Sequence, residues 1–157
     1  MGVANARDIS SRNLEMEGIT FDTWALLAFV FGEDEADSMD KLLRAMQENR
    51  IKGYFCVVNL AEFYRRISVE ENEKSAIEKS AWLMTTGIQF VSPNISMAMR
   101  AGSMKNKYPN LSYGDGFALA CALETNSKLL VTGDPDFNIR EINARMPGDA
   151  CGVLFDV

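Results

Sequence analysis

Residues 111–137 read LSYGDGFALACALETNSKLLVTGDPDF, and this stretch determines the fold class. Ser112 is a favoured N-cap residue, so we expect a helix to begin there and to run to about Thr125. The apolar run Lys128–Val131 is typical of a buried strand, and the turn-forming residues Thr132–Asp136 follow it. A helix followed directly by a buried strand is half of a β-α-β unit, which indicates a parallel sheet.

The same alternation continues through the rest of the chain. Further strands are expected at Ile19–Phe21, Tyr54–Val58 and Ile88–Val91, with a fifth at Gly152–Phe155. Helical patterns lie between them at Trp24–Phe31, Glu33–Asn49, Leu60–Ile67, Glu71–Thr86 and Asn94–Lys107. We therefore predict an α/β fold with a central parallel sheet of about five strands, covered by helices on both faces. Residues 18–157 are expected to form a single domain, and residues 1–17 a flexible N-terminal extension or a cloning remnant.

The composition, 47% hydrophobic and 24% charged, is that of a folded soluble protein. The longest apolar run, within Trp24–Phe31, is far shorter than the roughly 18 residues that cross a membrane. The N-terminus lacks the apolar core of a secretory signal. The three cysteines, Cys56, Cys121 and Cys151, are widely separated among apolar neighbours, which favours core thiols over disulfides or a zinc site. We expect a cytoplasmic protein with no membrane segment.

The chain contains no histidine. This excludes the usual serine and cysteine nucleophile systems, and also histidine-ligated zinc and other transition-metal sites. Acid–base or metal chemistry would then rest on carboxylates, whose hard oxygen atoms select Mg²⁺ or Mn²⁺. The net charge of −6 argues against tight, non-specific nucleic-acid binding, although bound cations and a local basic rim would offset it.

Four acidic residues are expected at one edge of the sheet. Asp22 and Asp134 follow the ends of the first and fourth strands, and Glu62 lies one helical turn after the second. Asp115 is in the first turn of the helix that precedes the fourth strand. Because this helix runs antiparallel to the strand, its N-terminus points to the carboxyl edge of the sheet, and Asp115 lies at the same edge as the other acids. In open parallel sheets, ligands bind outside the carboxyl ends of the strands.

Each acid also has a purely structural interpretation. Asp22 could be a helix N-cap, and Asp134 lies in an ordinary turn sequence. The other two acids match capping boxes, Asn59-x-x-Glu62 and Ser112-x-x-Asp115. Four unrelated caps need not converge, however, and clustered carboxylates repel one another unless cations neutralise them.

A carboxylate cluster of this kind suits hydrolysis of a phosphodiester by two metal ions. Two divalent ions about 4 Å apart can activate water and stabilise the leaving oxygen. Asp22, Asp115 and Asp134 would then ligate metal, and Glu62 would bridge a metal or orient its water.

Four short motifs resemble those of the PIN-domain family, in order and at suitable spacing. They are Ile19–Thr23 (ITFDT), Asn59–Glu62 (NLAE), Leu111–Ala120 (LSYGDGFALA) and Leu129–Phe137 (LLVTGDPDF). The resemblance implies a three-layer α/β/α sandwich, Mg²⁺- or Mn²⁺-dependent ribonuclease activity and frequent formation of homodimers. The compact form is similar to VapC-like toxins of toxin–antitoxin pairs, which a small antitoxin protein inhibits.

The resemblance also assigns roles to individual residues. Asp22, Glu62, Asp115 and Asp134 correspond to the catalytic carboxylates that bind metal. Asp136 matches a further acid of the last motif, and Thr132 matches a hydroxyl that braces the same loop. Trp24 departs from the family pattern, because many members carry a small polar residue at this position.

RNA phosphates would require cations near the acids. The candidates are Lys52, Arg65, Arg66, Lys105 and Lys107. Arg65 and Arg66 are favoured for RNA binding, because they follow Glu62 by three and four residues and one of them should share its helix face.

Three other interpretations compete with a toxin ribonuclease. A PIN-type domain could serve in RNA maturation or as a weakly active adaptor. A phosphoryl-transfer receiver also gathers acids at a strand edge, but it needs paired acids after the first strand and a lysine after the last. Here Asp22 precedes Thr23, and the last fifteen residues contain no lysine. A dinucleotide-binding module would need a G-x-G-x-x-G sequence after a strand, which is absent.

Overall fold

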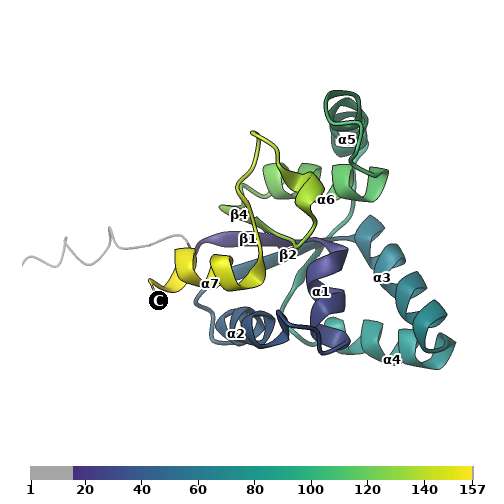
Figure 1. Ribbon diagram of the computed structural model, residues 1–157, viewed down its shortest axis with the longest axis vertical. Coiled ribbons are helices and arrows are strands. Elements are labelled where there is room, and N and C mark those ends of the chain that lie inside the picture. The colour runs from purple at the N-terminus through teal and green to yellow at the C-terminus, as the bar shows by residue number, and fades with distance from the viewer. Residues whose placement is uncertain (1–15, 157) are drawn as a thin grey trace, which may run out of the picture.

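The computed structural model describes residues 16–156, and in it five parallel strands form one sheet in the order β3-β2-β1-β4-β5 (Figure 1). The strands are β1 Gly18–Phe21, β2 Lys52–Cys56, β3 Gln89–Val91, β4 Leu129–Val131 and β5 Ala144–Arg145. Every pairing between neighbours is parallel. A flexible extension or cloning remnant is predicted for residues 1–17. Residues 1–15 of this segment lie outside the described range.

Helices cover both faces of the sheet. They are α1 Thr23–Val30, α2 Ala36–Gln47, α3 Val57–Glu70, α4 Glu73–Leu83, α5 Ile95–Lys107, α6 Tyr113–Glu124 and α7 Pro147–Phe155, with the 3-10 helix η1 at Pro135–Phe137. Figure 1 shows α5 and α6 on one side of the sheet and α1, α2 and α7 on the other. The predicted three-layer α/β/α sandwich is thereby confirmed. No helix in the described range is long and apolar enough to cross a membrane.

Alternation along the strands fills a core on each face of the sheet. Ile19 and Phe21 of β1 pack into the main core with α1 and α2. Between them, Thr20 faces the other side, where its hydroxyl lies 2.8 Å from the hydroxyl of Ser127. Leu130 of β4 likewise packs with α6 in a second core. Burial on both faces explains why these strands read as nearly continuous apolar runs.

The strand register places three strand ends at one edge. Phe21 of β1 lies opposite Phe55 of β2 and Val131 of β4. The residues that follow these strands therefore emerge side by side, as expected for the ligand-binding edge of a parallel sheet.

The predicted fifth strand at Gly152–Phe155 is wrong, because these residues belong to α7. Pro147 is the first residue of α7, a position where its fixed φ suits the helix and its missing N–H costs nothing. The fifth strand is instead Ala144–Arg145, a two-residue edge strand paired with β4. It contains no apolar run, so no periodic signal marks it in the sequence.

The second strand ends earlier than predicted. Val57 and Val58 form the start of α3, and Cys56 is the residue that flanks its N-terminus. β-branched residues lower helix propensity only slightly, so tertiary context overrides their preference for strands here. Asn59 consequently lies inside α3, and the predicted capping box between Asn59 and Glu62 does not form.

Candidate active site and metal centre

Asp22 connects the end of β1 to the start of α1. It is the N-cap of α1, where its Oδ1 accepts a hydrogen bond of 2.9 Å from the Ala25 N–H. Its Oδ2 accepts a hydrogen bond from the Thr132 hydroxyl. Burial raises the pKa of Asp22 from 3.8 to about 7. The two hydrogen bonds lower the pKa, whereas like-charge repulsion from Asp115 and Asp134 raises it. The side chain is therefore a helix cap that also lies within a cluster of acids.

Thr132 and Asp134 form the loop after β4. The Thr132 hydroxyl donates to Asp22 and accepts the Asp134 N–H at 3.0 Å, so it connects the two acidic positions. The Asp134 Oδ1 accepts the Asp136 N–H at 2.9 Å and caps η1. The hydroxyl thus links the end of β1 to the loop after β4.

Glu62 lies on α3 and is held by the α1 helix. The Thr23 hydroxyl lies 3.0 Å from the Glu62 Oε2 and 3.2 Å from the Asn59 carbonyl oxygen, and it can donate to either. The Asn59 side chain is buried, and its Nδ2 donates to the Gly114 carbonyl at 2.9 Å. Thr23 and Asn59 together tie α1, α3 and α6 to one another beside the acids.

Asp115 is at the start of α6, where the predicted capping box with Ser112 is present. The Asp115 Oδ2 accepts the Ser112 N–H at 2.8 Å, and the Ser112 hydroxyl accepts the Asp115 N–H at 3.0 Å. Burial raises the pKa of Asp115 above its ordinary value, and repulsion from Asp134 and Glu62 raises it further. These like-charge effects show that the three acids are electrostatic neighbours.

All four predicted acids line one cavity of about 250 Å³, at the edge where β1, β2 and β4 end. The other residues that line it are Thr23, Trp24, Leu27, Phe31, Glu33, Asn59 and Arg66. In residues 16–156, no three acidic or cysteine side chains lie close enough together to hold a metal ion.

The donor set nevertheless fits a hard divalent cation by its chemistry. Carboxylates from four different elements face one cavity, and the pKa of the most buried one, Asp22, is strongly raised. A bound Mg²⁺ or Mn²⁺ would favour the ionised form of these groups, and carboxylate oxygens are the ligands that such ions select. Asp22, Glu62, Asp115 and Asp134 are the residues that would hold it.

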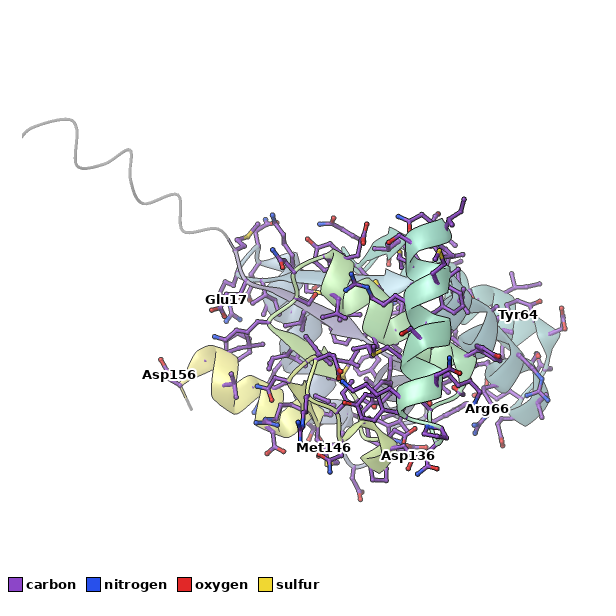
Figure 2. All side chains as sticks on the ribbon, turned by 90° about the horizontal axis from the view of Figure 1, so that it is seen from above. Glu17, Tyr64, Arg66, Asp136, Met146 and Asp156 are labelled. Carbon is purple, nitrogen blue, oxygen red and sulfur yellow. The ribbon has the colours of Figure 1, made fainter. Side chains whose placement is uncertain are left out.

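The remaining predicted residues are placed differently. Arg66 lines the cavity, whereas Arg65 does not. Asp136 is exposed and is not among the residues that line the cavity; Figure 2 shows it at the outer edge of the molecule. The Lys105 ammonium donates to the Leu111 carbonyl, and Lys107 pairs with Glu141. Lys52 is also outside the cavity lining.

Two supporting residues were not predicted from the sequence. Thr23 appears in the first motif only as the residue after Asp22, and Asn59 was interpreted as a helix cap. Asn59 precedes Glu62 by three residues, which places both on one face of α3. That spacing is the sequence signal for a shared site, but it can be read only when the helix begins at Val57 and not at Asn59.

Gly114 allows Glu62 its present position, and we predict that Gly114→Ala will impair function without loss of stability. A Cβ at this residue would lie 2.8 Å from the Glu62 Oε2, so the carboxylate would have to move. Because alanine suits a helix better than glycine, the free energy of unfolding should stay the same or rise by about 0.5–1 kcal/mol. Metal affinity or activity should fall about 10- to 100-fold, as is common when a residue that supports a metal ligand is changed.

The control for this variant is Gly102→Ala, on α5. Gly102 has no atom within 4 Å of an added Cβ, so only the helix-propensity gain is expected. Thermal unfolding and calorimetric titration with Mn²⁺ would separate the two effects. Equal metal affinity in both variants would show that the position of Glu62 does not matter to the site.

Comparison with known proteins identifies the family. The sequence model of the PIN domain family matches residues 19–142, which is most of the chain. No curated protein sequence matches it significantly. The fold is similar to Mycobacterium tuberculosis VapC20, described as a sarcin-ricin loop cleaving toxin, at 14% identity and a TM-score of 0.64 over 79% of this chain and 98% of that one.

Two toxin–antitoxin structures bound to DNA are similar in fold as well. VapBC2 from Rickettsia felis matches at 14% identity and a TM-score of 0.66, over 82% of this chain and 98% of that one. VapBC from Salmonella typhimurium matches at 11% identity and a TM-score of 0.67, over 84% and 99%. At these identities the structural likeness speaks for the fold alone, whereas the match of the family model covers all four predicted acids. The chain belongs to the PIN domain family.

Proposed function

We propose that this protein is a metal-dependent endoribonuclease that hydrolyses RNA phosphodiester bonds at the cavity lined by Asp22, Glu62, Asp115 and Asp134. The observation that carries the proposal is the presence of these four carboxylates around one cavity in a chain without histidine. Membership of the PIN domain family and the fold shared with VapC toxins support it.

Each acid has a defined part in this proposal. Mg²⁺ or Mn²⁺, when bound, supplies the activation of water and the stabilisation of the leaving oxygen. Asp22, Asp115 and Asp134 would hold it, and the Thr132 hydroxyl, which donates to Asp22, would orient that carboxylate. Asp136 is left as an outlying acid, since it is exposed and does not line the cavity.

Glu62 would bridge the ion or orient the attacking water. Its Oε2 can be held by the Thr23 hydroxyl, and within residues 16–156 its Oε1 has no hydrogen-bond partner. That oxygen is free to accept a hydrogen bond from water at the cavity, as a carboxylate in this role must.

The biological role that fits best is that of the toxin in a VapBC-type pair. The solved structures of similar fold include VapBC complexes and FitAcB from Neisseria gonorrhoeae. We accordingly propose a small antitoxin protein as partner, a homodimer as the assembled state and the cytoplasm as the location. The alternative is a role in RNA maturation or as a weakly active adaptor.

The function is tested by incubating the purified chain with RNA and Mg²⁺ or Mn²⁺, with and without EDTA. Defined RNA fragments that vanish with EDTA are expected, and uncut RNA under all conditions would refute the proposal. Expression in a bacterial host then separates the two roles. Growth arrest that a co-expressed neighbouring gene relieves indicates a toxin, whereas cleavage without growth arrest indicates RNA maturation.

Arg66 and Arg65 form a matched pair for testing substrate binding. Arg66 lines the cavity and lies 3.9 Å from Glu70 in an exposed ion pair, whereas Arg65 is outside the cavity. We expect Arg66→Ala to raise KM about 5-fold, the scale of an exposed charge contact, and Arg65→Ala to leave it unchanged. The slope of log affinity against log salt should fall by about 0.7 for Arg66→Ala only. Equal effects of both substitutions would indicate a general charge effect instead of a phosphate contact.

A further inference from the structure

Helix α1 presents an apolar face to the carboxylate cavity. Trp24, Leu27 and Phe31 all line this cavity, and their spacing of three and four residues is that of one helix face. Leu27 is buried, whereas Trp24 and Phe31 are partly exposed. The cavity therefore combines a set of carboxylates with two accessible aromatic rings from a single helix.

The Trp24 ring is held in place by the loop that carries Asp134. A Cβ added to Gly133 would lie 2.3, 2.4 and 2.5 Å from the Cη2, Cζ2 and Cζ3 atoms of Trp24. Because three consecutive ring atoms are almost equally close, the glycine lies against the face of the ring and not against its edge. Trp24 also lines a neighbouring cavity with Met146, so the ring stands between the two cavities. A fixed, partly exposed indole thus lies next to a proposed metal-binding carboxylate.

The cavity has few cations with which to hold RNA. Of the residues that line it within 16–156, five are acidic and only Arg66 is basic. Contacts of lysine and arginine with phosphates normally supply most of the sequence-independent affinity for nucleic acid. Because the whole chain carries a net charge of −6 and the cavity has a single basic residue, the affinity for RNA needs a source besides such contacts. Stacking of bases on aromatic rings is the alternative source, and it requires no positive charge.

We infer that the aromatic face of α1 is a nucleobase-binding site, in which Trp24 stacks on the base of a nucleotide next to the scissile phosphate. Phe31, the residue after the end of α1, lies about 10 Å further along the helix axis. The Lys79 ammonium lies 5.6 Å from its ring centroid, so the inference concerns the Trp24 ring. This inference rests on the proposed ribonuclease function, and it adds the groups that hold the substrate.

The two tryptophans of the chain provide a direct test, because only Trp24 lines the cavity. Trp82 stacks on Phe29 at a centroid distance of 5.4 Å and is absent from the cavity lining. Trp82→Phe therefore leaves Trp24 as the only indole fluorophore, and Trp24→Phe leaves Trp82 as the matched control. Both variants are titrated with a mixed-sequence, single-stranded oligoribonucleotide, with Ca²⁺ in place of Mg²⁺ to slow cleavage. The anisotropy of a labelled copy of the same oligonucleotide measures binding independently.

Emission from Trp24 is expected to change along the same binding curve as the anisotropy, while emission from Trp82 stays constant. Trp24→Ala should weaken binding about 5- to 150-fold, and Trp24→Phe should retain most of the affinity. The fluorescence arm decides the question even if Trp24→Ala is unstable. If the oligonucleotide binds and is cleaved while Trp24 emission stays constant, this inference is overturned and the proposed function is not. The same result is expected if the aromatic face binds a protein partner instead. RNA that is neither bound nor cleaved would overturn both this inference and the proposed function.

Discussion

Replacing Asp115 with asparagine is expected to reduce RNA cleavage on the order of 10³-fold while leaving the fold intact. The proposed metal ligand contributes several kcal/mol of charge stabilisation in the transition state, and each 1.4 kcal/mol is a factor of ten in rate. Burial raises the pKa of Asp115, and repulsion from Asp134 and Glu62 raises it further. The side chain lines the cavity as well as capping α6.

The fold should survive because asparagine can keep the cap. Asp115 accepts the Ser112 N–H through a single oxygen, Oδ2, and an asparagine carbonyl can accept the same hydrogen bond. The Asp115 N–H, which is a backbone group, continues to donate to the Ser112 hydroxyl. This substitution therefore separates the two interpretations of the residue, since a residue that only caps the helix would tolerate the change.

Asp37→Asn is the matched control, because it removes the same charge from an exposed residue in the first turn of α2. Cleavage rates, circular dichroism and uptake of Mn²⁺ by calorimetry should be measured for both variants. Asp37→Asn should match the wild type in all three, and Asp115→Asn should differ in cleavage and metal uptake only. If Asp115→Asn cleaves RNA at the wild-type rate, Asp115 has no part in the mechanism.

Much of this fold could be predicted from the sequence because burial on both faces leaves a strong local pattern. The runs at Ile19–Phe21 and Lys128–Val131 are short, apolar and followed by an acid or a turn, and both are strands of the central sheet. Because the strands are parallel, their carboxyl ends lie at one edge of the sheet. The four acids follow strand ends or begin helices at that edge, so their shared location follows from the topology.

The parts that could not be predicted depend on contacts between distant segments. β5 has only two residues and pairs through its backbone, which requires no particular side chain. Asn59 donates to the Gly114 carbonyl across 55 positions of sequence, and Trp24 packs on Gly133 across more than a hundred. No local propensity or periodicity carries such information, so the residues that surround the four acids emerge only from the structure.

Asp22→Asn is expected to stabilise the metal-free protein at neutral pH and to abolish its response to metal. The pKa of Asp22 is raised to about 7 from 3.8, so between these values the folded protein binds a proton that the unfolded chain has lost. Stability then falls as pH rises through this range, by about 4 kcal/mol for a shift of this size. Asparagine does not titrate, and it can still accept the Ala25 N–H as the cap of α1.

The measurement is thermal unfolding of both proteins in EDTA between pH 5 and pH 8. The variant should already be the more stable protein at pH 5, by about 2 kcal/mol or a few °C, because pH 5 lies above the unfolded pKa of 3.8. The difference should widen to roughly 10 °C at pH 8. The difference in unfolding temperature between the two proteins is compared at each pH. The contributions of the other titrating groups cancel in this difference, because both proteins contain them. A constant difference across this range would mean that Asp22 is already ionised in the fold without metal.

Added Mg²⁺ or Mn²⁺ completes the argument for Asp22 as a ligand. A cation that binds the ionised carboxylates only in the folded state stabilises the wild type. This stabilisation should be larger at pH 8 than at pH 5, because protons compete with the cation for the carboxylates at the lower pH. The variant should show little stabilisation at either pH and no cleavage, although its metal-free form is the more stable one. Higher stability together with lost activity is the signature of a residue retained for function, since a cap alone would be served equally well by asparagine. If metal stabilises both proteins equally, the ion binds elsewhere and the four-carboxylate site is wrong.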